Sequence, residues 1–250
     1  MITVIALLIG VLGLVIGSFL NVVIYRVPKG ESIVSPGSHC TECGHYLRPW
    51  ELIPVLSYLI LKGRCSKCGT AISRRYPAVE LLTGFLFVLT FLLRTERTVP
   101  GLICDIVFVS LLIALTFIDL DTFRLPDVLV SLVALIGAVN TFVTGDPVLW
   151  RSLLGALGIG GIFFLVAYLY PGGMGMGDVK FVAALGLYLG SPNIFIAIFV
   201  ASLFGSVIGG LHIITYQKQL KDPIPFGPFL AGGALLLLFC EDFVTALIHF

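Results

Sequence analysis

Residues 2–24 read ITVIALLIGVLGLVIGSFLNVVI and contain no charged side chain. A run of about 20 apolar residues is long enough to cross the hydrocarbon core of a bilayer as a helix. This run is too long for the apolar part of a signal peptide, and no basic residue precedes it. We therefore expect a membrane-spanning helix rather than a cleaved leader.

The composition of the whole chain agrees with a membrane protein. Of 250 residues, 58% are hydrophobic and 12% are charged, whereas a soluble domain has about 25% charged residues. The net charge of +1 gives no reason to expect a nucleic-acid partner. The apolar runs predict an all-α polytopic membrane protein with about eight transmembrane helices. The expected helices are 2–24, 78–93, 102–118, 128–144, 151–170, 179–190, 193–216 and 229–248.

The basic residues are unevenly divided between the two sides that these helices would create. Loops 25–77, 119–127, 171–178 and 217–228 fall on one side and, with Lys180, hold 12 of the 15 Lys and Arg residues. Cytoplasmic loops carry the excess of Lys and Arg. This side is therefore predicted to be cytoplasmic, with both termini on the other side.

The longest loop contains two cysteine pairs. Residues 40–43 read CTEC and residues 65–68 read CSKC, a spacing close to that of four-thiolate zinc sites. Gly44 and Gly69 directly follow the pairs, where a tight turn favours positive φ. Disulfides are the alternative, but they are rare in the reducing cytosol. We predict a zinc-ribbon-like insertion with a structural Zn²⁺, because four thiolates leave no position open for catalysis. The predicted ligands are Cys40, Cys43, Cys65 and Cys68.

Acidic residues gather where two predicted helices meet the cytoplasmic side. Asp119, Asp121 and Asp127 lie in FIDLDTFRLPD (117–127), and Asp178 lies in GGMGMGDVK (172–180). Two carboxylates held close together cannot both ionise easily, so one keeps its proton, as in aspartic proteases. The alternative is that these acids only cap helix ends in polar loops.

Other residues near these acids have more than one interpretation. Gly175 and Gly177 would let a peptide backbone approach Asp178 closely. Lys180 could pair with an acid or with substrate, or extend its amine toward the membrane surface. Glu80 follows Pro77 and is expected to complement the dipole at the start of the second helix.

Several motifs, in order, carry a family resemblance. They are GSFLNVVIYRVP (17–28), the two CxxC pairs around WELIPVLSYLILKGRC (50–65), ISRRYPAVELLTG (72–84), DLDTFRLPD (119–127), GMGD (175–178) and PFGPFLAGG (225–233). This set resembles the bacterial type IV prepilin peptidases, also called leader peptidase/N-methyltransferases. They are membrane aspartic proteases with a GxGD motif.

The resemblance implies roles for particular residues. Asp178 matches the aspartate of GxGD, and Asp119 matches the second catalytic aspartate, with Asp121 as the rival. The family cleaves short basic leaders from type IV prepilins and type II secretion pseudopilins at the cytoplasmic face of the bacterial inner membrane. Many members then methylate the new N-terminus with S-adenosylmethionine. A peptidase without methyl transfer, a cation transporter and an assembly scaffold are the alternatives.

The expected domain organisation follows from these assignments. Residues 1–24 would form the first transmembrane helix, residues 25–77 the cytoplasmic zinc domain, and residues 78–250 the membrane peptidase domain.

Overall fold

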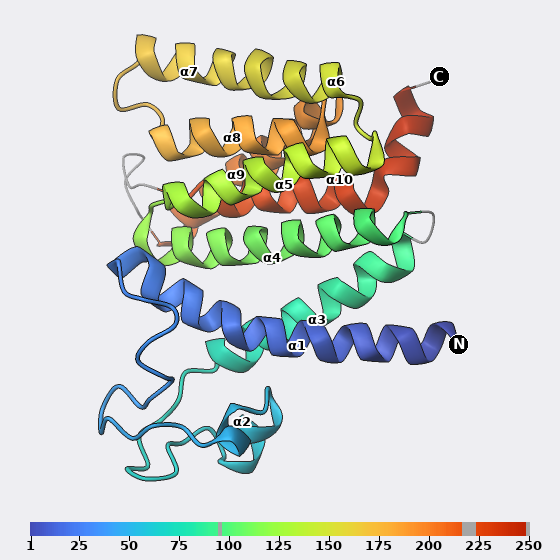
Figure 1. The fold of residues 1–250 in the computed structure, drawn as a ribbon. Helices are drawn as coiled ribbons and strands as arrows, with labels where there is room; N and C mark the ends of the chain where they lie inside the picture. The colour runs from blue at the N-terminus through green and yellow to red at the C-terminus, as the bar shows by residue number, and fades with distance from the viewer. Residues whose placement is uncertain (95–96, 217–223, 249–250) are drawn as a thin grey trace. The chain divides into compact units, whose positions relative to one another are not determined.

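The computed structural model describes residues 1–94, 97–216 and 224–248, with the side chains of 212–216 and 241–248 left aside. The chain divides into two compact units, Met1–Thr95 and Glu96–Phe250. Helices form at each of the eight predicted places, and the described residues contain two isolated β-bridges but no longer strand (Figure 1). The prediction of an all-α protein is therefore confirmed, while the division at residues 24 and 77 stays a prediction.

The first unit is built on two helices, α1 (Ile2–Arg26) and α3 (Arg75–Leu93), which pack along each other. Glycines set their closest approach: a Cβ on Gly13 or Gly17 would lie 2.7 Å from a backbone Cα of α3. Small residues at such crossings are typical of helices that pack within membranes. Between the two helices the chain forms the short helices η1 (Val27–Lys29), η2 (Pro49–Leu52) and α2 (Leu56–Ile60).

Glu80 has a different role from the predicted one. Because α3 begins at Arg75, Glu80 lies beyond its first turn and is buried. Its Oε2 accepts a hydrogen bond of 2.7 Å from the backbone N–H of Val55. Val55 has φ 61°, which is unfavourable for a β-branched residue. Glu80 therefore holds a strained turn instead of complementing the start of the helix.

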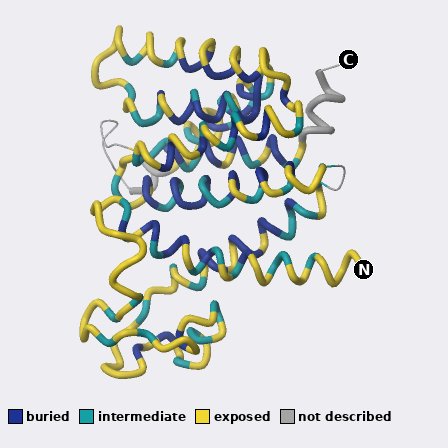
Figure 2. Tube along the Cα trace, viewed as in Figure 1, coloured by how far each residue is buried: buried dark blue, intermediate teal, exposed yellow. Residues whose placement is uncertain are grey.

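The second unit is a layered helix bundle. The helix α5 (Asp127–Thr144) packs against both α4 (Val99–Thr122) and α8 (Met176–Leu189), while α9 (Asn193–Tyr216) and α10 (Gly227–Ile248) pack together (Figure 1). Figure 2 shows buried residues along α4, α5 and α8, whereas α7 is mostly exposed. A Cβ on Gly137 of α5 would lie 2.9 Å from the backbone nitrogen of Tyr188, so α5 and α8 are in close contact.

The predicted helix at 151–170 contains a local irregularity. It consists of α6 (Leu149–Leu153), a π-helical segment η3 (Leu154–Ile159) and α7 (Gly160–Leu169). Such π segments are rare and occur mostly as single turns inside longer helices. Here the segment includes Gly155, where a Cβ would collide with the backbone of Gly186 in α8.

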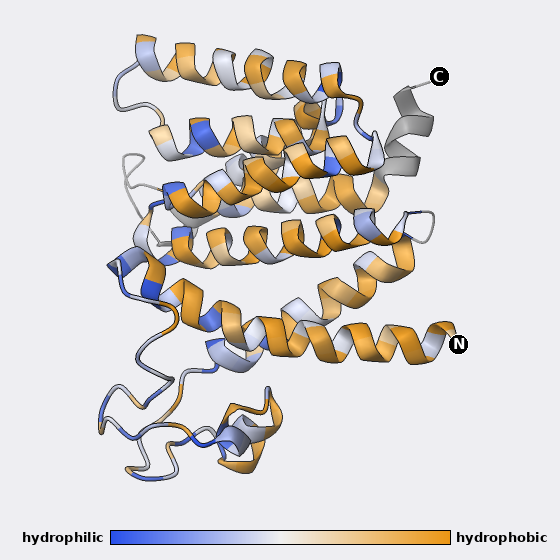
Figure 3. Ribbon diagram, viewed as in Figure 1, coloured by the Kyte–Doolittle hydropathy of each residue, from blue (hydrophilic) through white to orange (hydrophobic). Residues whose placement is uncertain are grey.

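The helices have the length and composition expected in a bilayer. Within the described residues, six are long and apolar enough to cross a membrane, and the apolar part of α10, Gly227–Cys240, is shorter. Apolar residues cover the helices, including outward-facing positions such as Leu157, Phe164 and Phe199 (Figure 3). Exposed apolar surface on this scale suits contact with lipid, and the chain is a multi-pass membrane protein.

Two helix boundaries differ from the prediction in ways that affect the acids. The helix α4 continues to Thr122 rather than ending at residue 118, and α8 begins at Met176 rather than at residue 179. Asp119 therefore lies in the last turns of α4 and Asp178 in the first turn of α8, not in the connecting loops. Chain direction then reverses at Phe123, which has φ 54°.

Candidate active site

Asp119 is a buried carboxylate near the end of α4, with 4% of its surface exposed. Its Oδ2 accepts a hydrogen bond of 2.9 Å from the backbone N–H of Gly227, the first residue of α10. The first N–H groups of a helix have no partner within the helix and favour a negative charge. The start of α10 therefore stabilises a carboxylate that the apolar surroundings alone would disfavour.

Asp178 lies at the same end of this unit as Asp119, although 59 residues separate them in sequence. It is half-buried in the first turn of α8. Gly177, the residue before it, lies against Leu125 in the segment between α4 and α5. The two candidate acids thus come from different helices of one compact unit and meet at the same end of it.

The other predicted polar residues of this unit are more exposed than Asp119 and Asp178. Asp121 is exposed, in contrast to Asp119. The Nζ of Lys180 forms an ion pair of 2.8 Å with Oδ1 of Asp127, and both side chains are at least half exposed. An ion pair this exposed contributes at most about 1 kcal/mol. Of the interpretations left open for Lys180, the structure favours pairing with an acid.

The glycines before Asp178 are required for two different reasons, lack of space for a side chain and positive φ. Gly175 has φ −72°, so it needs no left-handed conformation. A Cβ on Gly175 would lie 3.2 Å from Oδ2 of Asp178. A Cβ on Gly177 would lie 3.3 Å from the Cβ of Leu125. Both positions are therefore constrained by space, whereas Gly172 has φ +86° and makes the turn.

A cavity of about 300 Å³ lies beside the start of α10. Its walls are mainly aromatic and small side chains from α9 and from the segment around Gly227. The residues are Ser202, Gly205, Ser206, Ile224, Phe226 and Phe229. Gly227 sits between two of these lining residues in sequence, so the cavity adjoins the backbone that binds Asp119.

Gly227 was not singled out from the sequence, and it offers a sharp test of this geometry. A Cβ on Gly227 would lie 2.7 Å from Oδ2 of Asp119 and 3.1 Å from Leu125. We expect Gly227→Ala to displace the carboxylate and slow turnover by about 10- to 100-fold, because displacements near 1 Å have such effects. Gly232→Ala, in the same helix with open space around it, is the matched control and should keep the wild-type rate.

The four predicted cysteine ligands come together in the first unit. Their Sγ atoms all lie within 4.8 Å of one another. The Sγ atoms of Cys40 and Cys68 are 3.8 Å apart, and those of Cys43 and Cys65 are 4.0 Å apart. A tetrahedron with metal–sulfur bonds of about 2.3 Å requires sulfur–sulfur distances of about 3.8 Å. The group therefore fits a tetrahedral metal ion.

Each cysteine pair is held by the same backbone turn. The N–H of Cys40 donates to the carbonyl of His45 at 2.9 Å, and the N–H of Cys65 donates to that of Thr70 at 2.8 Å. Gly44 and Gly69 have φ 68° and 73°, so the predicted positive φ after each pair is confirmed. Isolated β-bridges flank both turns.

Glu51 connects the two turns, a role that its sequence position did not indicate. Its buried carboxylate accepts hydrogen bonds from Ser66 in the second pair and from the backbone N–H of Arg48. Its Oε2 also lies 3.3 Å from Nε2 of His45, just after the first pair. These contacts, chiefly the one from Ser66, hold the pKa of Glu51 below its usual range. Glu51 is therefore an anion at neutral pH.

Comparison with known proteins places this arrangement in a family. The chain is 36% identical to the prepilin leader peptidase/N-methyltransferase of Pseudomonas aeruginosa, covering 94% of this chain and 90% of the relative. The proteins of the same name from Neisseria gonorrhoeae and Bacillus subtilis are 37% and 34% identical, over 94% of this chain and 90% and 94% of theirs. This chain belongs to the prepilin leader peptidase family.

Two family models divide this chain between the two sites. Residues 11–93 match the bacterial peptidase A24 N-terminal domain, and residues 106–210 match the type IV leader peptidase family. The first range includes the four cysteines and the second includes Asp119 and Asp178. No solved structure matches the chain.

Proposed function

We propose that this protein is a membrane aspartic endopeptidase that removes the basic leader from type IV prepilins or pseudopilins. Asp119 and Asp178 are its catalytic pair. The observation that supports the proposal is that a buried and a half-buried aspartate from separate helices lie at one end of the unit, where Leu125 is close to both Gly177 and Gly227. Family membership supports the same reaction, since the relatives are named prepilin leader peptidases.

The proposed mechanism divides acid and base work between the two carboxylates. One carboxylate is ionised and takes a proton from the attacking water. The other is protonated and donates a hydrogen bond to the scissile carbonyl, then transfers its proton to the leaving amine. The N–H of Gly227 holds Asp119 at the start of α10, and the cavity lined by Phe226 and Phe229 flanks Gly227 in the sequence.

The proposed site faces the cytoplasm of the bacterial inner membrane. The distribution of Lys and Arg supports this orientation. A prepilin could then keep its apolar helix in the bilayer and its charged leader in the cytosol. The scissile bond would lie at the membrane surface between them, where α4 and α8 carry the acids.

We infer that the four-cysteine group holds a structural Zn²⁺, since four thiolates at these distances suit zinc. The relatives are also named N-methyltransferases, and we propose that the new N-terminus is methylated with S-adenosylmethionine as donor. No residue in the described parts of the chain is assigned to the donor. A peptidase without methyl transfer remains the second candidate.

The direct test is mass spectrometry of a prepilin co-expressed with the protein in a host lacking other such peptidases. We expect loss of the leader, with a cut after glycine, and the mass increment of one methyl group on the new N-terminus. A cleaved product without the methyl increment would support peptidase activity and contradict methyl transfer. An intact leader would overturn the proposal.

A further inference from the structure

Asp105 is a second buried carboxylate of α4, and it lies far from the proposed catalytic pair. Its exposed fraction is 0%. It precedes Asp119 by 14 residues in one continuous helix, which places it about 21 Å away along the axis. A buried charge is costly unless it is paired and hydrogen-bonded, so its partners indicate why it is there.

One partner is Tyr188, in the last turn of α8. The Tyr188 hydroxyl donates to Oδ1 of Asp105 at 2.5 Å, a short charge-assisted hydrogen bond. The Tyr188 ring also stacks on Phe108 of α4, with ring centroids 3.7 Å apart and an interplanar angle of 0°. A single side chain of α8 is thus fixed to α4 at two points.

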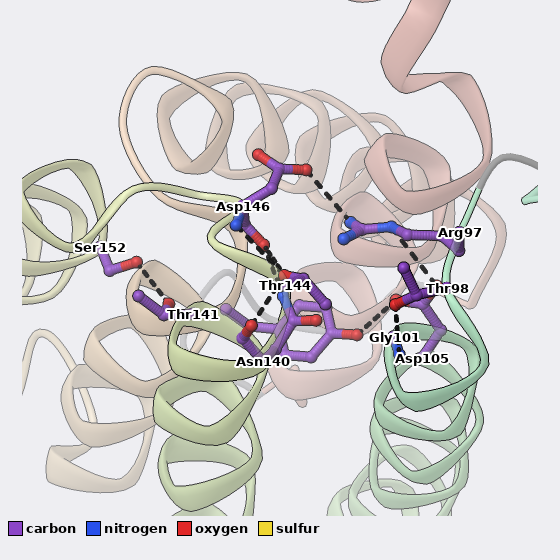
Figure 4. Close-up of polar contacts among 10 residues, drawn as sticks. Arg97, Thr98, Gly101, Asp105, Asn140, Thr141, Thr144, Asp146 and Ser152 are labelled. Carbon is purple, nitrogen blue, oxygen red and sulfur yellow. Dashed lines mark hydrogen bonds and ion pairs between the residues drawn. The ribbon is translucent and has the colours of Figure 1, made fainter.

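A surrounding polar cluster steadies Asp105 from the other side (Figure 4). Arg97 lies with its Nε 3.8 Å from Oδ2 of Asp105 and its Nη2 3.4 Å from Oδ2 of Asp146. The backbone carbonyl of Asp146 accepts a hydrogen bond of 2.8 Å from Asn140 at the end of α5. The start of α4, the end of α5 and the end of α8 are therefore joined in one network.

The contact between Asp105 and Tyr188 joins the same two helices that carry the proposed catalytic pair. The helix α4 carries Asp105 near its start and Asp119 near its end. The helix α8 carries Asp178 in its first turn and Tyr188 in its last. The body of α5 packs against both helices, and Tyr188 reaches past it to α4. The two helices are joined at one end and present their acids at the other.

We propose that Asp105 and Tyr188 are positioning residues that fix the sliding position of α8 against α4, and thereby the separation of the Asp119 and Asp178 carboxylates. The inference rests on the proposed function. Catalysis by two carboxylates depends on their separation, because their mutual repulsion decides which one keeps its proton. A displacement near 1 Å costs about 100-fold in rate. Loss of the contact between Asp105 and Tyr188 should therefore lower kcat.

The test measures kcat, KM and the pH dependence of kcat for prepilin cleavage by purified variants of the full chain. Tyr188→Phe keeps the ring on Phe108 and removes the hydroxyl. We expect kcat to fall about tenfold or more with KM unchanged, and the two limbs of the pH profile to change their spacing. Asp105→Asn keeps an acceptor for the Tyr188 hydroxyl, so kcat should fall less.

A matched control separates positioning from stability. The hydroxyls of Thr141 and Ser152 form a buried hydrogen bond of 2.8 Å between α5 and α6, and neither helix carries a proposed catalytic residue. Ser152→Ala should also lower the melting temperature, while leaving kcat and the pH profile as in the wild type.

Each outcome is informative about one of the two proposals. Wild-type kcat and pH profile in Tyr188→Phe, or the same loss of kcat in Ser152→Ala, would overturn the positioning role. Should Tyr188→Phe fail to accumulate in the membrane, wild-type kcat and pH profile in Asp105→Ala, which removes the acceptor of the Tyr188 hydroxyl, would overturn it equally. Full cleavage by Asp178→Asn would instead contradict the proposed function. The result for Tyr188→Phe bears only on the positioning role.

Discussion

Asp119→Asn is expected to lower the rate of leader cleavage by at least about 10³-fold, whereas Asp121→Asn keeps a rate close to that of the wild type. Asparagine cannot take a proton from water or share one with Asp178, and loss of a proton-transfer group costs about 10²- to 10⁴-fold. Its side chain can still accept the hydrogen bond from Gly227, so the helix end stays in place. The measurement is the initial rate of prepilin cleavage in detergent or nanodiscs.

Asp121 is the matched control because it lies two residues away on the same helix and is exposed, while Asp119 is buried. Equal amounts of each variant in the membrane fraction would show that insertion is unaffected. Loss of cleavage in Asp121→Asn with retention in Asp119→Asn would reverse the assignment of the two acids.

Removal of the metal is the second large effect. Structural zinc contributes about 10–16 kcal/mol to the folding of small zinc domains, and the segment around the cysteines has few regular elements of its own. We expect about one zinc per chain by metal analysis. After Cys65→Ser, zinc should be lost and proteases should cut between residues 30 and 72.

Cys240→Ser is the control for the metal experiment, since Cys240 is exposed in α10 and lies outside the cysteine group. It should retain the zinc and the protease resistance of the wild type. A Cys65→Ser variant with full zinc content would contradict the four-thiolate site, and purified wild-type protein without zinc would do the same.

The sequence predicted those features that depend on local composition. Apolar runs are direct consequences of the bilayer as solvent, and they indicated where the helices form. The two CxxC pairs and the glycines after them indicated the metal group, because a tight turn around a metal needs both. The family motifs indicated which two aspartates to pair.

Tertiary contacts explain what the sequence could not predict. Hydropathy ends the third helix at residue 118, since an acid normally leaves the bilayer there. Asp119 stays within α4 because Gly227, 108 residues later in the chain, supplies an N–H. The contact between Asp105 and Tyr188 spans 83 residues, and no local pattern marks it. The contacts of Glu51 with both cysteine turns depend in the same way on tertiary structure.

The most direct test of the central claim compares cleavage rates of Asp119→Asn, Asp178→Asn and the double variant with that of the wild type. Residues that act as one catalytic unit are strongly non-additive. We expect each single variant to lose at least about 10³-fold in rate and the double variant to be no slower than either. Full cleavage by either single variant would contradict the proposed catalytic pair.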